Sequence, residues 1–314
     1  MTLTELRYIV AVARERHFGR AAEACFVSQP TLSVAIRKLE SELGVTMFER
    51  GGTEVGVTAI GQQLVTQAQK VLEESANLKE MARLGHDPLA GTLRVGIIYT
   101  IGPYLLPRLV PNQIERVPQM PLVLQENFTV KLIELLRQGE IDCAIMALPL
   151  PEAGLVLQPL YDEPFYVAVP AAHPWAQRKA IPADELKQQN MLLLGSGHCF
   201  RDQVLEVCPE LSRFAATSDG IQRTFEGSSL ETIRHMVAAG VGITVLPATS
   251  IVSEDKANKL LRYIPFEKPA PLRRVVLAWR KSFTRVAAVH ALAETIYATA
   301  LPGVQMLKDD VARQ

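Results

Sequence analysis

The stretch FGRAAEACFVSQPTLSVAIRKL, residues 18–39, predicts two short helices separated by a tight turn. The first covers residues 18–24, and the second opens at Gln29 after Ser28, which is placed to cap it. Pro30 is acceptable there because the first helical turn needs no backbone donor at that position. One apolar face follows the second helix and consists of Leu32, Ala35, Ile36 and Leu39. Two helices joined in this way form a helix-turn-helix, whose second helix enters the major groove of DNA.

The residues on either side complete the predicted DNA-binding domain, residues 1–60, which we call the reading head. An apolar helix precedes the helix-turn-helix, with Leu6, Ile9, Val10 and Ala13 at helical spacing. A small hairpin, or wing, is predicted over residues 48–58. Residues 1–60 contain seven Lys or Arg and seven Asp or Glu, so the head has no surplus of positive charge. DNA binding must therefore rest on the local placement of a few side chains and on helix N-termini.

A long polar helix is predicted from Ala59 to Leu84. Its apolar seam repeats in alternating steps of four and three and consists of Leu64, Ala68, Val71, Ser75, Leu78 and Ala82. One interpretation is that this seam packs on its own domain. The favoured interpretation is pairing with a second copy of the chain, because the helix is long and polar everywhere else.

Past residues 85–88 the pattern changes to alternating strands and helices. Strands are expected at 92–98, 122–125 and 143–147, with helices at 105–117 and 130–138 between them. A second series has strands at 166–169, 191–194 and 243–246 and a helix at 230–239, and the last strand and helix, 274–279 and 285–300, are expected to return to the first sheet. Such alternation implies βαβ units with parallel strands, here arranged as two lobes with a cleft between them. The tail after Pro302 is expected to fray.

The composition is that of an ordinary globular chain. Its 314 residues are 48% hydrophobic and 21% charged, with 33 basic and 33 acidic residues, and the length suffices for two or three domains. No stretch is long enough to span a membrane, and the first residues lack the basic and then apolar pattern of a secretory signal. We therefore expect a cytoplasmic protein without a membrane partner. In that compartment a cysteine pair is more often catalytic, metal-binding or redox-sensing than structural.

Two of the four cysteines, Cys199 and Cys208, stand nine residues apart in GSGHCFRDQVLEVCP, residues 195–209. If the segment between them is helical, its rise separates them by about 13 Å. A disulfide needs Cα atoms within about 7 Å, so the bond can form only if the segment unfolds locally. The alternative is that both are buried small hydrophobic residues that never meet. A metal site is disfavoured because no cluster of Cys and His completes a tetrahedral set, and no cofactor is expected.

The glycines before Cys199 favour a particular chemistry for it. The lead-in Ser196-Gly197-His198 would place Cys199 at the N-terminus of a helix over residues 200–207. Exposed N–H groups and the helix dipole favour an anion there, and the thiolate is the form that attacks peroxide. His198 and Arg201 are expected to add donors. The other two cysteines, Cys25 and Cys143, lie in apolar patterns and are expected in the core.

Three motifs of the reading head, FGRAA (18–22), SQPTLS (28–33) and LExxLGVxMFER (39–50), strongly resemble the LysR-type transcriptional regulators. The remainder fits that family over essentially the full length. Within the family, the cysteine segment and the stretch SLETIRxMVAAGxGIT (229–244) are similar to the members that sense hydrogen peroxide.

The resemblance implies an α/β fold with an N-terminal winged helix-turn-helix over residues 1–58 and a dimerising linker helix over 59–88. A two-lobed regulatory domain like the periplasmic binding proteins follows over 89–302, with a tail at 303–314. Lobe I takes in about residues 89–161 and 268–302, and lobe II about residues 162–267.

The resemblance also implies roles for individual residues. Peroxide would oxidise Cys199 to a sulfenic acid, and Cys208 would condense with it to a disulfide that rearranges the regulatory domain and the oligomer on DNA. The peroxide pocket would include Thr100, Thr129, His198 and Arg273. Adjacent Arg274 leaves the register of the arginine open, and fixing the loop is the alternative role for His198. The DNA contacts would come from Gln29, Thr31, Ser33, Arg37, Arg50 and Thr53, whereas Arg20 and Lys38 are as readily solvated surface charges.

The implied function is that of a cytoplasmic, non-enzymatic activator of oxidative-stress genes. Its partners would be double-stranded promoter DNA, RNA polymerase and further copies of itself in a tetramer built as a dimer of dimers. One alternative is a LysR-type regulator that answers a small metabolite in the inter-lobe cleft and has inert cysteines. Another is a thiol peroxidase, against which stands the N-terminal reading head, because such an enzyme has no use for it.

Overall fold

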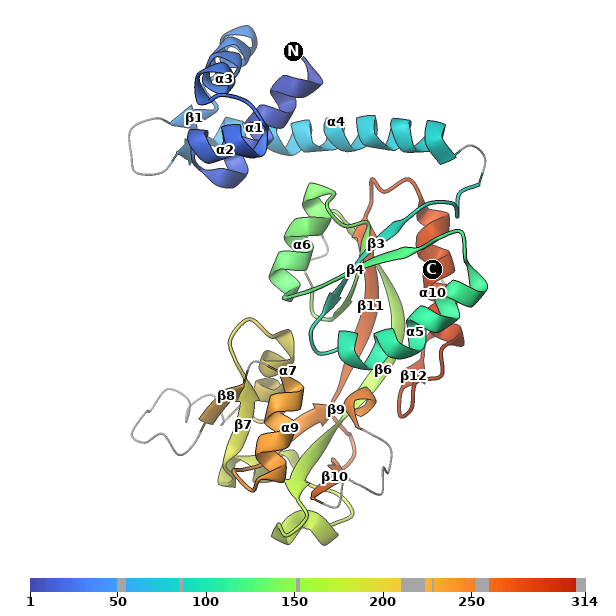
Figure 1. The fold of residues 1–314 in the computed structure, drawn as a ribbon. Helices are drawn as coiled ribbons and strands as arrows, with labels where there is room; N and C mark the ends of the chain where they lie inside the picture. The colour runs from blue at the N-terminus through green and yellow to red at the C-terminus, as the bar shows by residue number, and fades with distance from the viewer. Residues whose placement is uncertain are drawn as a thin grey trace. The chain divides into compact units, whose positions relative to one another are not determined.

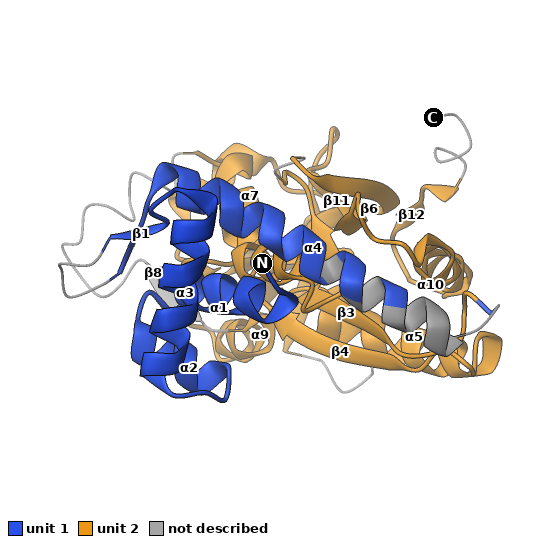
Figure 2. Ribbon diagram, turned by 90° about the horizontal axis from the view of Figure 1, so that it is seen from above, with its two compact units in different colours: residues 1–87 blue, residues 88–314 orange. Residues whose placement is uncertain are grey.

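Helices build the first of two units into which the chain divides, residues 1–87 and 88–314 (Figure 2). The computed structural model describes residues 1–49, 55–84, 87–150, 153–209, 224–227, 229–251 and 260–308. Helix α1 (Leu3–Glu15) begins with a capping box between Thr2 and Glu5. Helix α2 (Phe18–Ala24) follows, and α3 (Gln29–Leu43) ends at Gly44, whose φ of 67° suits a residue without a side chain.

The predicted helix-turn-helix is confirmed in its details. The Ser28 side chain caps α3 by accepting a hydrogen bond from the Thr31 backbone N–H. The apolar face of α3 buries Leu32, Ile36 and Leu39 completely in a core shared with α1 and α2. Strands β1 (Phe48–Glu49) and β2 (Gly56–Val57) pair antiparallel at the expected hairpin. Arg50 and Thr53, both expected to contact DNA from this wing, lie outside the described residues.

Helix α4 (Ala59–Leu84) has the predicted bounds, but its apolar seam is divided. At its N-terminal end Ala68 is buried and Leu64 half-buried in the core of the reading head, together with Val65. That part of the seam therefore packs on its own domain, whereas pairing of the helix with a second copy of the chain stays a prediction. Further along, Val71 and Leu78 are exposed.

Lobe I of the second unit contains the predicted βαβ units. Strand β3 (Leu93–Ile98) pairs in parallel with both β4 (Leu122–Asn127) and β5 (Cys143–Ala147). Helices α5 (Gly102–Arg116) and α6 (Thr129–Gln138) connect these strands. Every residue of β5 is buried, so Cys143 lies in the core as expected.

Two long strands connect the lobes (Figure 1). The first half of β6 (Leu155–Pro170) pairs antiparallel with β11 (Leu272–Arg280), which also pairs with β5. The second half of β6 pairs with β9 (Thr244–Pro247) and β10 (Leu261–Pro265). Because β11 and then α10 (Val286–Ala298) complete lobe I, the predicted return of the last elements to the first sheet is confirmed.

The C-terminal residues are more ordered than expected. Strand β12 (Gln305–Met306) pairs with β6 at Asp162 and Tyr161, and Leu307 is buried. The expected fraying therefore does not begin at residue 303, because this short strand finds a partner in the sheet of lobe I.

Lobe II has its own core. Strand β7 (Met191–Leu194) pairs in parallel with β8 (Thr224–Gly227), and helices α7 (Cys199–Val207) and α9 (Leu230–Ala238) accompany them. Three short 3₁₀ helices, η1 (Pro174–Gln177), η2 (Ala183–Gln188) and η3 (Ala248–Ser250), complete the lobe. Helix α7 buries Phe200, Val204 and Cys208 in this core, while Cys199 packs against the core of lobe I. The start of α7 therefore lies where the two lobes meet.

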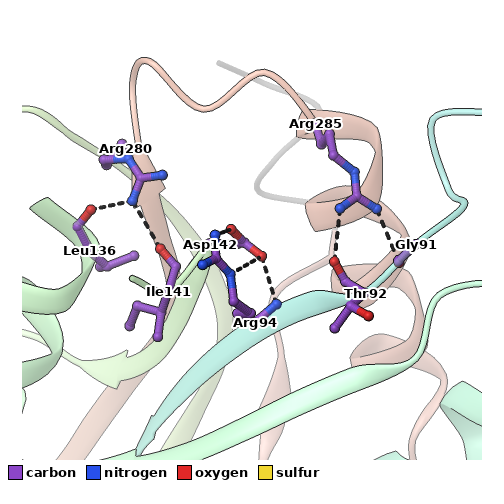
Figure 3. A network of polar contacts seen from close by, with 8 residues as sticks. All are labelled: Gly91, Thr92, Arg94, Leu136, Ile141, Asp142, Arg280 and Arg285. Atoms are coloured by element: carbon purple, nitrogen blue, oxygen red, sulfur yellow. Dashed lines mark hydrogen bonds and ion pairs between the residues drawn. The ribbon is translucent and has the colours of Figure 1, made fainter. Parts of the chain in front are cut away.

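Exposed and half-buried arginines hold one end of lobe I together (Figure 3). Asp142 accepts hydrogen bonds from the Arg94 backbone N–H at 2.7 Å and from its guanidinium at 2.9 Å. Arg280 donates to the carbonyl oxygens of Leu136 and Ile141, and Arg285 donates to that of Thr92 at 2.9 Å. These bonds fix the segments that precede β3 and β5, and β3 leads at its other end into the lobe I part of the site. Among the described residues, no helix combines the length and the apolar character that crossing a membrane requires.

Candidate functional site

Cys199 is the first residue of α7, and Cys208 caps the opposite end of the same helix. The chain leaves β7 and turns at Gly197, whose φ of 95° is strained for any residue with a side chain. Cys199 is partly exposed, Cys208 is fully buried, and neither forms a disulfide in the structure described. The helical rise separates their backbones by about 13 Å. The separation predicted from the sequence is therefore present, and a disulfide between Cys199 and Cys208 requires the helix to unwind.

A small cavity opens beside Cys199. The volume available to the centre of a water molecule is about 10 Å³, which is room for about one such molecule. Its lining joins residues from both lobes and consists of Ile98, Tyr99, Thr100, Asn127, Phe128, Thr129, Gly197, His198 and Cys199. Three of the four residues expected around Cys199, namely Thr100, Thr129 and His198, are thus brought together with it.

The two threonine hydroxyls differ in their hydrogen bonds. Thr100, just after β3, is buried, and its Oγ1 accepts a hydrogen bond from Arg273 Nη1 at 2.8 Å. Because that contact uses the oxygen as an acceptor, the Thr100 O–H remains a donor. Thr129 begins α6, and its buried Oγ1 has no hydrogen-bond partner within the described residues. A small molecule with oxygen atoms in the cavity would satisfy both hydroxyls.

Arg273 reaches this site through Thr100. Its Nη1 and Nη2 donate to the Thr100 hydroxyl and carbonyl, at 2.8 and 3.0 Å, and its Nε donates to Glu163 at 2.7 Å. The guanidinium also lies 5.1 Å from the centre of the Phe200 ring, next to Cys199 in the chain. Arg274 instead pairs with Asp162. Arg273, and not Arg274, is thus the arginine that bonds to a residue of the cavity, and its hydrogen bonds go to Glu163 and Thr100.

Glu163 completes a buried polar chain that the sequence did not indicate. Its side chain and that of Arg273 are both fully buried, and Thr249 donates its N–H to Glu163 at 2.7 Å. A buried charge pair is tolerated only when further hydrogen bonds satisfy both partners, as they do here. Glu163 lies in the middle of β6, 110 residues from Arg273, so only strand pairing brings the two together.

His198 and Arg201, both expected as donors beside the thiol, pack and bond as follows. The His198 ring is 8% exposed and packs edge-on against Phe128 and Tyr99, with centroids 4.8 and 5.9 Å apart. Its side chain makes no capping bond to α7. Arg201 donates to the Leu194 carbonyl at 3.0 Å and so ties α7 to the end of β7.

The reading head presents the expected DNA contacts at its surface. Gln29, Thr31 and Arg37 on α3 are exposed, and Ser33 is half-buried. Arg20 donates to the Glu15 carbonyl at 2.7 Å, which favours the alternative of a structural surface charge. Cys25 caps the end of α2 and is half-buried against the domain core, and this burial raises the pKa of its thiol.

Comparison with known proteins assigns the chain to a family. Residues 3–62 match the bacterial regulatory helix-turn-helix protein of the lysR family, and residues 86–300 match the LysR substrate binding domain. The DNA-binding transcriptional dual regulator OxyR of Escherichia coli K12 is 43% identical over 298 residues, 95% of each chain.

Solved structures agree with this assignment. Full-length OxyR of Pseudomonas aeruginosa, with a cysteine replaced by aspartate, is 52% identical with a TM-score of 0.74, over 96% of this chain and 99% of that one. A Corynebacterium glutamicum OxyR mutant with bound H₂O₂ is 34% identical with a TM-score of 0.62, over 95% and 92% of the two chains. These relatives are transcriptional regulators and not enzymes. The chain therefore belongs to the LysR family of bacterial helix-turn-helix regulators and, within that family, is similar to OxyR.

Proposed function

We propose that this chain is a cytoplasmic transcriptional activator that binds double-stranded DNA and responds to hydrogen peroxide through Cys199. The observation that carries the proposal is the position of Cys199: it begins α7, lines a water-sized cavity with two threonine hydroxyls, and has Cys208 at the far end of the same helix. Relatives named hydrogen peroxide-inducible genes activators, 42–43% identical over 89–95% of this chain, support it.

The first step is oxidation of Cys199. The helix N-terminus favours the thiolate, which attacks one peroxide oxygen. The S–O bond forms as the O–O bond breaks, so sulfur is oxidised to sulfenic acid and the second oxygen leaves as hydroxide. In this step the hydroxyls of Thr100 and Thr129, which line the cavity, would hold the peroxide and donate to the departing oxygen.

The second step joins the two cysteines. The Cys208 thiol attacks the sulfenic sulfur, the S–S bond forms, and the S–O bond breaks with release of water. Because Cys208 is buried in the core of lobe II, this step requires α7 to unwind and Cys208 to leave that core. The unwinding then changes the surface of the regulatory domain, and with it the tetramer on DNA and its contact with RNA polymerase.

Peptide mapping and transcription test this proposal on the full chain. Adding stoichiometric H₂O₂ to reduced protein should give a Cys199–Cys208 disulfide, a changed DNase footprint and activated transcription. Cys199→Ser should abolish all three, whereas Cys208→Ser should stop at the sulfenic acid. An identical footprint and identical transcription before and after oxidation would overturn the switch.

One observation favours the alternative of a metabolite-sensing regulator. A crevice of about 480 Å³, measured for the centre of a water molecule, lies beside α7 and is lined by Leu148, Phe165, Gln203 and Arg274 among others. Its size suits a small organic ligand. Cys199→Ser separates the two functions, because a metabolite sensor would keep its transcriptional response in that variant.

A further inference from the structure

Three residues with aromatic rings line the Cys199 cavity. Tyr99 follows β3, Phe128 precedes α6, and His198 precedes α7. The Phe128 ring centre lies 5.2 Å from that of Tyr99 and 4.8 Å from that of His198, and 5.9 Å separates Tyr99 from His198. All three pairs meet edge to face, a favourable arrangement for aromatic side chains. The three rings, which we call the aromatic cluster, therefore form one closed contact set drawn from both lobes.

The aromatic cluster lines the cavity and is partly exposed to solvent. All three residues line the cavity, yet Tyr99 and Phe128 are each 38% exposed, so one side of each residue faces the cavity and another faces water. His198 is the inner member of the cluster, at 8% exposed. Gly197 lies beside the Phe128 ring, where a Cβ would make an ordinary contact at 3.4 Å, so it is the φ of 95° that favours glycine at this position.

The size of the space behind the cluster limits what can react. Room for about one water-sized molecule admits H₂O₂ after a small shift of the rings. An alkyl hydroperoxide carries the same reactive O–O bond but adds a hydrocarbon body. For that body to enter, the edge-to-face contacts of the cluster must open. The rings thus oppose alkyl hydroperoxides much more than H₂O₂.

We propose that Tyr99 and Phe128 are specificity-determining residues that restrict the oxidation of Cys199 to H₂O₂ and exclude alkyl hydroperoxides. This inference rests on the proposed function, in which the Cys199 thiolate is the peroxide nucleophile. With either oxidant the thiolate attacks the terminal oxygen, the O–O bond breaks, and the sulfur becomes a sulfenic acid. The leaving group is hydroxide from H₂O₂ and an alkoxide, protonated to the alcohol, from an alkyl hydroperoxide. The two leaving groups differ in size and in basicity, but their basicity is the same in every variant, so the change in the ratio of the two rates between variants reports on space.

Rates of sulfenic acid formation test the inference. We use the full chain in a Cys208→Ser background, where oxidation stops at the sulfenic acid, trap that product with dimedone and quantify it by mass spectrometry. The oxidants are H₂O₂ and tert-butyl hydroperoxide. Phe128→Ala should raise the tert-butyl hydroperoxide rate by about tenfold or more and leave the H₂O₂ rate within about threefold. Tyr99→Ala should act in the same direction and provides a second variant if one is poorly folded.

Val130→Ala is the matched control, because Val130 is 77% exposed on α6 two residues after Phe128. It should change neither rate. Equal rates for both oxidants in the wild-type background, or variants that change both rates by the same factor, would overturn the inference while leaving Cys199 as the sensor. The second result would mean that the rings only support α7. Absence of sulfenic acid with either oxidant would instead overturn the proposed function, and the inference with it.

Discussion

At the scale of single residues, the site depends on the hydrogen bond that Arg273 donates to Thr100. The guanidinium donates to the Thr100 oxygen, so the Thr100 hydroxyl can donate its own proton to another group. Because the Thr100 side chain lines the cavity, that group would be a molecule bound in the cavity. The buried arginine is itself held by Glu163, which lies in the same layer of buried polar groups. Arg273 therefore acts as a positioning residue for the hydroxyl and not as a direct partner of the thiol.

This arrangement predicts the effect of Thr100→Val. The substitution keeps the shape of the side chain but removes the donor, so oxidation of Cys199 by H₂O₂ should slow by about tenfold or more. Stopped-flow measurement of thiol loss in reduced protein gives the rate. Thr66→Val is the control, since Thr66 is exposed on α4 and its hydroxyl bonds only to the Gln62 carbonyl of its own helix. An unchanged rate in Thr100→Val would contradict the assigned role.

A second prediction at this scale concerns Cys143. Burial, and then the neighbouring Asp142 carboxylate, raise the pKa of the Cys143 thiol above its ordinary value of 9.0. Below that value both folded and unfolded chains hold the proton, whereas above it only the unfolded chain loses it, so stability falls as the pH rises. This thiol should lower the free energy of unfolding by about 1.4 kcal/mol between pH 8 and pH 10.

Urea unfolding under reducing conditions measures that change. Cys143→Ala leaves a smaller core side chain and lowers stability at every pH, so the comparison uses the pH dependence and not the absolute value. The wild-type chain should lose about 1.4 kcal/mol more than the variant between the two pH values. Parallel pH dependences would show that Cys143 ionises in the folded state.

At the scale of elements, α7 is the helix that must unwind for the Cys199–Cys208 disulfide to form. Its inner face is held by Phe200, Val204 and Cys208 in the core of lobe II, and Gln203 Nε2 donates to the Leu148 carbonyl of lobe I at 2.8 Å. The Gln203 Oε1 atom is buried without a hydrogen-bond partner in the part of the chain that the structure describes. One strong and one missing polar contact make this residue a modest restraint on unwinding.

Gln203→Met is expected to speed formation of the disulfide without changing the first oxidation step. The substitution keeps the volume and removes a hydrogen bond worth about 1 kcal/mol, which corresponds to about a fivefold faster closure if unwinding limits the rate. Quenched alkylation after H₂O₂ addition separates sulfenic acid from disulfide. Glu206→Gln, at an exposed position of the same helix, should leave both steps unchanged. Slower closure in Gln203→Met would show that unwinding is not limiting.

At the scale of the whole molecule, α4 joins the reading head to the regulatory domain and carries the surface through which we expect the chain to self-associate. The N-terminal part of α4 is occupied by its own domain, whereas Val71 and Leu78 leave apolar surface further along, with Leu78 71% exposed. An exposed heptad position on a polar helix is typical of a surface that pairs with another helix.

Leu78→Glu should therefore weaken self-association, because it places a charge in an apolar seam. Sedimentation velocity at a fixed protein concentration should show a shift from the larger species to a smaller one. Gln67→Glu introduces the same charge at an exposed position of α4 outside the seam and should leave the distribution unchanged. If both variants sediment like the wild type, this part of α4 is not the interface.

Local patterns alone determined much of this protein. The cap at Ser28, the apolar face of α3, the bounds of α4 and β5, and the position of Cys199 at a helix N-terminus follow from spacing and from the residue types at helix ends. The motifs of the reading head also pointed to the LysR family. These features were predictable because neighbouring residues dictate them.

Only the tertiary structure decided which residues meet at the site. The long strands β6 and β11 bring Glu163 to Arg273 and carry Arg273 to Thr100, although these residues are far apart in the chain. The same crossing places Tyr99 and Phe128 of lobe I against His198 of lobe II. It also places Arg273, and not Arg274, beside Thr100, because successive residues of a strand point to opposite faces of the sheet. Such contacts depend on strand register and lobe packing, and no local pattern in the sequence contains that information.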